Sequence, residues 1–227
     1  MRTRSLPTPL NKSLGSNLDQ LPDLKLRPAN HASERIFNSP RVEKRSRRRS
    51  CCLKKNMFDN ECVLNEFMVQ YLQLLVADID EADLDHQPVD GFNPPRWILG
   101  HLAVYTDYAL RATGARFHCP KQWHRNFARG TKVDQRPEDL PTKNDLIEKI
   151  VSGFSTVRDR ARQMDHSGTE SRHSVPFLSS TPLTTVGHVV SHLMTTHFAG
   201  HLGQLSAWRR ICGRPPVEPT QPDGTTD

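Results

Sequence analysis

Three histidines occupy positions that leucine would normally fill in a helix core. His197 and His201 are four residues apart, so in a helix they stack one turn apart on the same face. A rotation of about 100° per residue places both in an apolar stripe, which comprises Leu183, Val186, Val190, Leu193, His197, His201, Gln204, Trp208 and Ile211. His101 lies in the same way on an earlier apolar face, which comprises Trp97, Ile98, His101, Val104, Tyr105, Tyr108 and Ala112. Because the inward faces of bundled helices meet, we expect His101, His197 and His201 to share one metal ion.

Three neutral imidazoles are suitable ligands for zinc, nickel, copper or iron(II). A site with only three protein ligands keeps coordination positions open for water or substrate, as catalytic metal sites do. Gln204 lies one turn beyond His201 and is a candidate for orienting a ligand or a water molecule. Tyr105 and Tyr108 are candidates for donating a hydrogen bond or a proton. The alternative is that all these residues only pack and hydrogen-bond within the core.

The remaining histidines and the cysteines give weaker signals. His188 and His192 point about 180° away from the first pair, which predicts surface or loop-packing roles. The spacing of His118, Cys119 and His124 matches no standard ligand pattern, so we expect no second metal site there. The five cysteines are odd in number and show no CxxC spacing, which predicts thiols without a disulfide or a thiolate zinc site.

Four amphipathic helices must position these side chains. The first is expected over residues 62–79, with an inner face formed by Val63, Leu64, Phe67, Met68, Tyr71, Leu72, Leu75 and Ile79. Asn93-Pro94-Pro95 is typical of a helix start, and this second helix is expected to end near Thr113. Residues 115–140 contain turn-forming residues and no strong period, which predicts a long connection with one short helical turn.

The last two helices have clear start and stop signals. Thr142 and Asp145 have the spacing of a capping box at the start of the third helix. The fourth helix should begin near Thr181 and end at Gly213, a residue type that favours helix ends. No segment shows a convincing strand pattern, so we predict an all-α fold, a four-helix bundle.

Charge and composition divide the chain. Residues 1–55 carry fourteen Lys or Arg against four acids, a net charge of +10, whereas the whole chain is only +6. We predict that residues 1–56 form a disordered basic leader, residues 57–216 the bundle, and residues 217–227 a disordered tail. The run from Lys44 to Arg49 could bind nucleic acid, but a solvated tail is the preferred interpretation. Translation from Met57 is a further alternative, since the helical pattern begins directly after it.

Neither a secretory signal nor an apolar run of the roughly 18 residues needed to span a bilayer is apparent, so a cytoplasmic protein without membrane association is expected.

Two segments resemble the DinB-like superfamily. They are Trp97-Ile98-Leu99-Gly100-His101-Leu102 and His197-Phe198-Ala199-Gly200-His201-Leu202-Gly203-Gln204-Leu205. The resemblance as a whole covers about residues 57–216. In that family, a W-x-x-x-H segment in helix two and an H-x-x-x-H-x-G-Q segment in helix four supply three histidine ligands. Carried over to this sequence, the resemblance implies His101, His197 and His201.

The resemblance also implies a range of activities. Family members include bacillithiol- and mycothiol-dependent transferases, a maleylpyruvate isomerase and domains of ergothioneine-forming iron enzymes, which share thiol chemistry near a divalent metal. The iron-dependent branch is similar but uses H-x-x-x-H-x-E, where this sequence has Gly203. We therefore expect zinc or nickel rather than iron, a low-molecular-weight thiol as cosubstrate, and transferase or hydrolase activity on a small molecule.

The alternatives are a non-catalytic metal-binding or stress-associated protein, and a bundle that only carries a nucleic-acid-binding leader. Gly200 and Gly203 would permit close helix approach between the subunits of a homodimer, although the sequence leaves the oligomeric state open.

Overall fold

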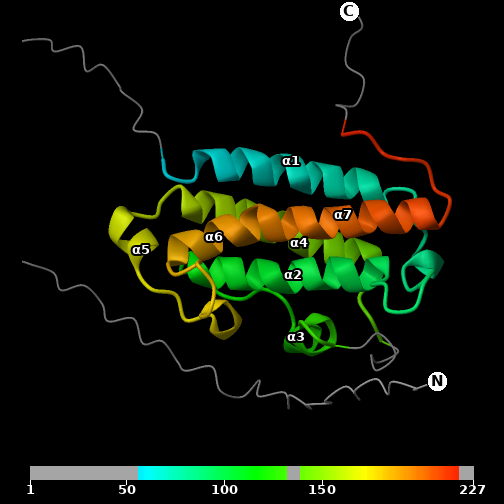
Figure 1. Cartoon of the computed structure of the whole chain (residues 1–227), viewed down its shortest axis with the longest axis horizontal. Coiled ribbons are helices and arrows are strands. Elements are labelled where there is room, and N and C mark those ends of the chain that lie inside the picture. The colour runs from blue at the N-terminus through cyan, green and yellow to red at the C-terminus, as the bar shows by residue number, and fades with distance from the viewer. Residues whose placement is uncertain (1–55, 132–138, 220–227) are drawn as a thin grey trace, which may run out of the picture. The chain divides into compact units, whose positions relative to one another are not determined.

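The computed structural model describes residues 56–131 and 139–219. Four long helical elements pack side by side in this part of the chain (Figure 1). They are α1 (Asp59–Val76), α2 (Pro95–Ala112), α4 (Lys143–Ala161) and the consecutive helices α6 (Val186–Met194) and α7 (Thr196–Ile211). No strand forms among the described residues, and the predicted all-α four-helix bundle is confirmed. Residues 1–55 and 220–227 lie outside the description, so the disorder expected for the leader and the tail stays a prediction.

Short helices occupy the connections of the bundle. They are η1 (Glu81–Asp83), α3 (Lys121–Phe127), α5 (His166–Glu170) and η3 (Pro176–Leu178). The helix α3 is the short helical piece expected within residues 115–140, and it lies against the outer side of α2 (Figure 1). Because α2 also packs against α4, α6 and α7, it is buried on nearly all sides. Because of this central position, side chains on different sides of α2 meet side chains from different neighbouring helices.

The inner face of α1 differs from the predicted one. Val63, Leu64 and Phe67 were expected inside, but they are 67%, 52% and 46% exposed. The buried residues of the helix are instead Cys62, Asn65, Met68, Val69, Leu72, Leu75 and Val76. The predicted and the observed buried residues both recur at helical spacing. Periodicity alone therefore could not show which of these two overlapping faces of α1 is turned to the core.

A polar residue decides the orientation of α1. Asn65 is fully buried, and its Nδ2 donates to the Met194 carbonyl at 3.0 Å while its Oδ1 accepts from Arg158 Nη1 at 2.9 Å. A buried amide without partners would destabilise the fold, so these two contacts require Asn65 to face α4 and the end of α6. The outward rotation of Val63 follows from this requirement.

The start of α4 agrees with the sequence pattern. The Thr142 side chain accepts from the Asp145 backbone N–H at 3.2 Å, and Asp145 Oδ2 accepts from the Thr142 N–H at 3.0 Å. These reciprocal bonds form the predicted capping box. The second helix begins one residue later than its asparagine suggested, with Pro94 rather than Asn93 at the N-cap. The helix start is thus confirmed and only the capping residue differs.

The predicted fourth helix is broken in two, which corrects the single helix expected from Thr181 to Gly213. It begins only at Val186, after the capping residue Thr185, and it is interrupted at Thr195, whose φ and ψ are −125° and −83°. The Thr195 hydroxyl donates to the Ser191 carbonyl at 2.6 Å, a bond that competes with helical backbone bonding. The bond from Asn65 described above satisfies the last carbonyl before the break. The break changes the rotation of α6 relative to α7.

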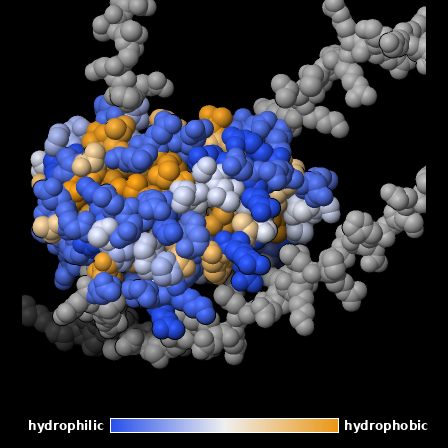
Figure 2. Space-filling view, turned by 180° about the vertical axis from the view of Figure 1, so that it is seen from behind, coloured by the Kyte–Doolittle hydropathy of each residue, from blue (hydrophilic) through white to orange (hydrophobic). Residues whose placement is uncertain are grey.

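The surface of the described part is largely polar, with an apolar patch on the rear face. Figure 2 shows this patch in the upper half of the molecule, the side on which α1 lies in Figure 1. Val63, Leu64 and Phe67, the exposed residues of α1 described above, are apolar. No helix in the described ranges is long and apolar enough to cross a bilayer.

Candidate metal centre

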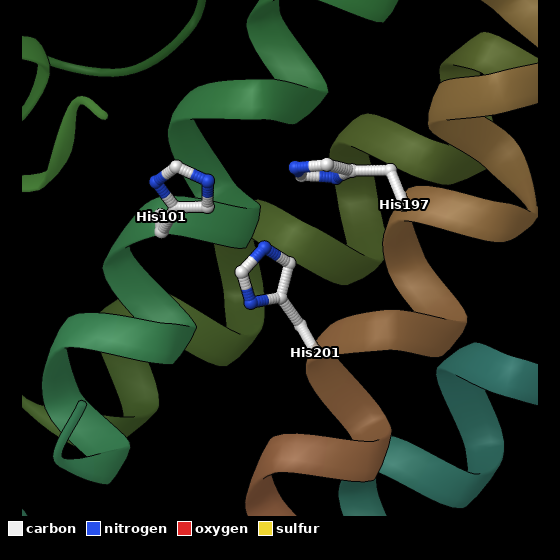
Figure 3. A group of neighbouring side chains, drawn as sticks. All are labelled: His101, His197 and His201. Atoms are coloured by element: carbon white, nitrogen blue, oxygen red, sulfur yellow. The ribbon is translucent and has the colours of Figure 1, made fainter. Parts of the chain in front are cut away.

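The three predicted histidines converge between two helices. His101 points from α2, and His197 and His201 point from α7, toward a common space (Figure 3). One ring nitrogen of each lies within 4.8 Å of the others. The ring centroid of His201 is 4.7 Å from that of His101 and 4.7 Å from that of His197, and the remaining pair is 5.4 Å apart. The convergence expected from helical periodicity is therefore present.

Hydrogen bonds fix the orientation of two of the rings. The Phe127 carbonyl lies 2.7 Å from His101 Nδ1, and since a carbonyl only accepts, that nitrogen donates. His201 Nδ1 donates in the same way to Gln204 Oε1 at 3.0 Å. In both residues the Nε2 lone pair remains available as a metal ligand, and outer hydrogen bonds of this kind orient ligating imidazoles. The residue that holds His101 comes from the end of α3.

The third ring has an unpaired nitrogen. The Nδ1 atom of His197 is buried and has no hydrogen-bond partner among the described residues. A buried polar atom without a partner is costly unless an ion or a water satisfies it. A cation bound at this nitrogen would satisfy that requirement, and three imidazole nitrogens are a suitable donor set for a divalent metal ion.

Burial keeps all three imidazoles neutral. Burial, assisted by the nearby His201, lowers the pKa of His101 to about 4. Burial lowers the pKa of His197 strongly, and the neighbouring His201, His101 and His192 lower it further. The pKa of His201 is also lowered by burial, against a smaller opposing effect of its hydrogen bond to Gln204. Neutral imidazoles have the free lone pair that metal binding requires.

Aromatic rings enclose the three histidines. The Trp97 ring is stacked on His101 with centroids 4.6 Å apart and an interplanar angle of 16°. Tyr105 is stacked on His197 at 4.4 Å, also at 16°. The indole nitrogen of Trp97 donates to Thr131 Oγ1 at 2.9 Å, which holds the indole in place. His101 and His201 are consequently only 5% and 9% exposed.

The two tyrosines predicted as site residues occupy different layers. Tyr105 contacts His101 as well as His197, with centroids 4.1 Å apart in the first pair. Tyr108 packs against Tyr105 at 5.3 Å and lies farther from the histidines, toward His124. Burial, and then the neighbouring Tyr108, raises the pKa of Tyr105 to about 12, and burial also raises the pKa of Tyr108. Both hydroxyls therefore keep their protons near neutral pH.

The sequence pattern missed one neighbour of this centre. His192 was predicted to point away from the site, but its ring centroid lies 5.7 Å from that of His197. The two histidines lie on either side of the break at Thr195, where the backbone departs from the helical geometry on which the prediction rested. Its Nδ1 lies 2.7 Å from Thr196 Oγ1, and burial lowers its pKa. The exposed His188 does have the surface role expected of it, because it takes part in the capping box of α6.

Comparison with known proteins identifies the family of this chain. The family model described as the DinB superfamily matches residues 65–205, which include all three histidines and Gln204. No curated protein matches the chain. The match covers more than half of the chain, and the helical fold agrees with it. This chain belongs to the DinB superfamily.

Proposed function

We propose that this protein is a divalent-metal-dependent enzyme whose ion is held by His101, His197 and His201. The observation that supports the proposal most directly is that these three neutral ring nitrogens come together while two of the rings are held by outer hydrogen bonds. Three ligands leave coordination positions for a substrate, which favours catalysis over a purely structural role. The reaction proposed is a thiol-dependent transfer or a hydrolysis on a small molecule.

The donor set favours zinc or nickel over iron. All three candidate ligands are nitrogen atoms, and no carboxylate belongs to this group within the described residues. Gly203, which stands where the iron-dependent relatives carry glutamate, is exposed and supplies no ligand. When bound, a divalent ion would lower the pKa of a coordinated thiol or water and so supply a nucleophile near neutral pH.

The residues of the chain would orient the reactants and exclude water. Gln204 keeps the His201 ring in one orientation, because Nδ1 of that ring donates to it. Tyr105 lies against His101 and His197 and keeps its proton, so its hydroxyl is suited to donate a hydrogen bond to a substrate. Tyr108 is suited to support Tyr105 through their ring contact rather than to reach the ion itself.

Metal analysis tests the site. We expect His101→Ala and His197→Ala each to contain one divalent ion fewer per chain than the unmodified protein after identical metal loading. Gly203→Ala is a matched control, because a Cβ at this position on α7 would meet no neighbouring atom. Equal metal content in all four proteins would contradict the site. The metal-loaded protein should then be assayed with several low-molecular-weight thiols and electrophiles.

A non-catalytic metal-binding role is the second candidate, and one observation favours it. His101 and His201 are almost fully buried under Trp97 and Tyr105, which restricts access to the ion. Such a protein would bind the ion with the same stoichiometry and would show no turnover with any thiol. Replacing Trp97 by Ala should open the site. If this change produces no turnover and leaves metal content unchanged, storage or sensing is favoured over catalysis.

Three further expectations from the sequence stay proposals. A homodimer is compatible with α7, where Gly200 and Gly203 are exposed and a Cβ atom at either position would meet no neighbouring atom. A cytoplasmic location and nucleic-acid binding by the basic leader rest on the sequence alone. Salt-sensitive nucleic-acid binding that persists after deletion of residues 1–56 would contradict a role of the leader.

A further inference from the structure

A second group of chemically reactive side chains lies around Asp107, on another side of α2. Asp107 is fully buried, and its carboxylate accepts from the backbone N–H groups of His118 at 2.8 Å and Cys119 at 3.1 Å. Its Oδ2 also lies 2.8 Å from His124 Nε2. These contacts hold the segment after α2 and the first turns of α3 against the carboxylate. They also bring together an oxygen, two imidazoles and a thiol.

The ligand atoms of this group are close enough to share an ion. One atom each of Asp107, His118 and Cys119 lies within 4.8 Å of the other two. The ligand atoms of a tetrahedral zinc site, with bonds of about 2.0–2.3 Å, are roughly 3.3–3.8 Å apart. Small side-chain adjustments therefore suffice to close the three around one cation. His124 lies outside this group of three but contacts Asp107 through Nε2, which donates to the carboxylate. It becomes the fourth ligand when its proton shifts to Nδ1 and the lone pair of Nε2 turns to the ion.

Hydrogen bonding within the protein leaves part of this group unsatisfied. The Nε2 atom of His118 is buried and has no hydrogen-bond partner in the described part of the chain. It lies 3.7 Å from Asp107 Oδ1, which is too long for a hydrogen bond. The Cys119 thiol contacts the Ala103 carbonyl at 3.4 Å and also hydrogen-bonds to Asp107, but thiols are weak donors. A cation would use both the nitrogen lone pair and the sulfur.

The neighbouring helix leaves room for the His118 ring. A Cβ atom at Gly153 of α4 would lie 2.3 Å from His118 Cε1 and 2.4 Å from Thr106 Cγ2. Any larger residue at that position would displace the His118 ring or the Thr106 side chain. The ring is therefore confined between α2 and α4, with its Nε2 directed toward the carboxylate.

We propose that Asp107, His118 and Cys119, completed by His124, bind a second divalent metal ion of the zinc class. Carboxylate oxygen, imidazole nitrogen and thiolate sulfur are all zinc ligands, and four protein ligands make a closed structural site. Binding replaces the S–H bond of Cys119 by a sulfur–metal bond and releases the proton to solvent. One carboxylate and one thiolate then balance the charge of a dication. The ion would fasten the 114–120 connection and α3 to α2.

Cobalt(II) substitution can distinguish this site from the three-histidine site. A cobalt–thiolate bond produces a sulfur-to-metal charge-transfer band in the near ultraviolet, whereas a site with only histidine ligands produces none. The full-length protein carrying Cys51→Ser and Cys52→Ser serves as background, which removes two other thiols. After removal of bound metal by a chelator, cobalt(II) is titrated while absorbance and bound metal are measured.

We expect two cobalt ions per chain and a charge-transfer band in the background protein. Cys119→Ser should abolish the band and the corresponding ion, and the matched control Cys212→Ser should keep both. His101→Ala should lose the other ion and keep the band, so failure of the first site is distinguishable from failure of this one. A background protein without the band, or a band that survives Cys119→Ser, would overturn the proposal.

A second measurement decides the question if Cys119→Ser fails to fold. Alkylation of Cys119 in the otherwise unmodified protein, followed by peptide mass analysis, should slow at least about tenfold when zinc is added. Cys212, which is partly exposed at the end of α7, is the internal control and should react at an unchanged rate. An equal rate at Cys119 with and without zinc would overturn the proposal.

Discussion

The two candidate metal centres of this protein lie on different sides of the same helix and are built in different ways. The three-histidine centre takes its side chains from α2 and α7, two regular helices. The Asp107 centre takes one side chain from α2 and the others from the following connection and α3. Regular helices space residues periodically, so the first centre is visible in the sequence. A connection has no such period, and its side chains converge only through tertiary contacts.

The centres also differ in ligand chemistry. The first offers three neutral nitrogen donors enclosed by Trp97 and Tyr105, whereas the second offers a carboxylate, a thiol and two imidazoles. In the second centre, backbone N–H groups hold the Asp107 carboxylate. In the first centre, the Phe127 carbonyl holds the His101 ring and the Gln204 side chain holds the His201 ring. The first arrangement keeps positions open for chemistry, and the second is suited to fasten a loop. This difference can be tested by changing each centre in turn.

The largest expected effect is on stability. Asp107→Ala should lower the free energy of unfolding of the metal-free protein by about 3–5 kcal/mol, because it leaves buried N–H groups and His124 without their acceptor. His197→Leu should change it by less than about 1 kcal/mol, since the Nδ1 atom it removes has no partner among the described residues. Urea denaturation measures both, and equal losses would contradict the comparison.

The second expected effect is a pH dependence of the free energy of unfolding, to which the histidines of the first centre contribute most. In the unfolded chain His101 binds a proton near pH 6.5, but in the folded protein only near pH 4. The unfolded state therefore binds more protons between these values, and metal-free stability should fall as the pH decreases from 6.5 toward 4. The share of His101 is about 3 kcal/mol at 1.36 kcal/mol per pKa unit.

Urea denaturation of the metal-free protein at several pH values measures this dependence. His101→Leu should reduce the slope by the share of His101, because the variant lacks that imidazole, while His197 and His201 keep their own contributions. An unchanged slope in this variant would show that His101 is not held neutral by the fold.

Two glycines allow each centre to be disturbed separately. A Cβ at Gly100 would lie 2.3 Å from the ring of Phe127, whose carbonyl holds His101, whereas a Cβ at Gly153 would meet His118. Replacing either by Ala should cost about 1–3 kcal/mol from overpacking. Gly100→Ala should weaken metal binding mainly at the first centre and Gly153→Ala mainly at the second. Cobalt titration distinguishes binding at the two centres, because only the second produces the thiolate band. Loss of the band in Gly100→Ala but not in Gly153→Ala would contradict the assignment.

The smallest expected effect concerns a hydrogen bond outside the ligands. Gln204→Leu removes the acceptor of His201 Nδ1 and should weaken metal binding at the first centre by about 10–100-fold. Gln204→Glu keeps an acceptor and should retain most of the affinity. Competition with a chromophoric chelator measures the affinity, and the Asp107 centre should not respond to either change. Wild-type affinity in the leucine variant would remove Gln204 from the site.

The sequence determined the parts of this protein that depend on local periodicity and local hydrogen bonding. The capping box of Thr142 and Asp145 involves residues three apart, and it marked the start of α4 correctly. The placement of His101, His197 and His201 on inward faces followed from the helical repeat, and these faces meet as bundle geometry requires. The four-helix fold followed from the same repeat.

Tertiary structure decided what depends on contacts between distant segments. The partners of Asn65 lie on α4 and at the end of α6, so the sequence of α1 could not show which flank of its stripe is buried. The break at Thr195 placed His192 beside the first centre against the expectation of one continuous helix. Asp107 became the centre of a second group only when the chain after α2 folded back on it. Helical spacing holds within one element, whereas the partners of a buried polar group are chosen by the packing of several.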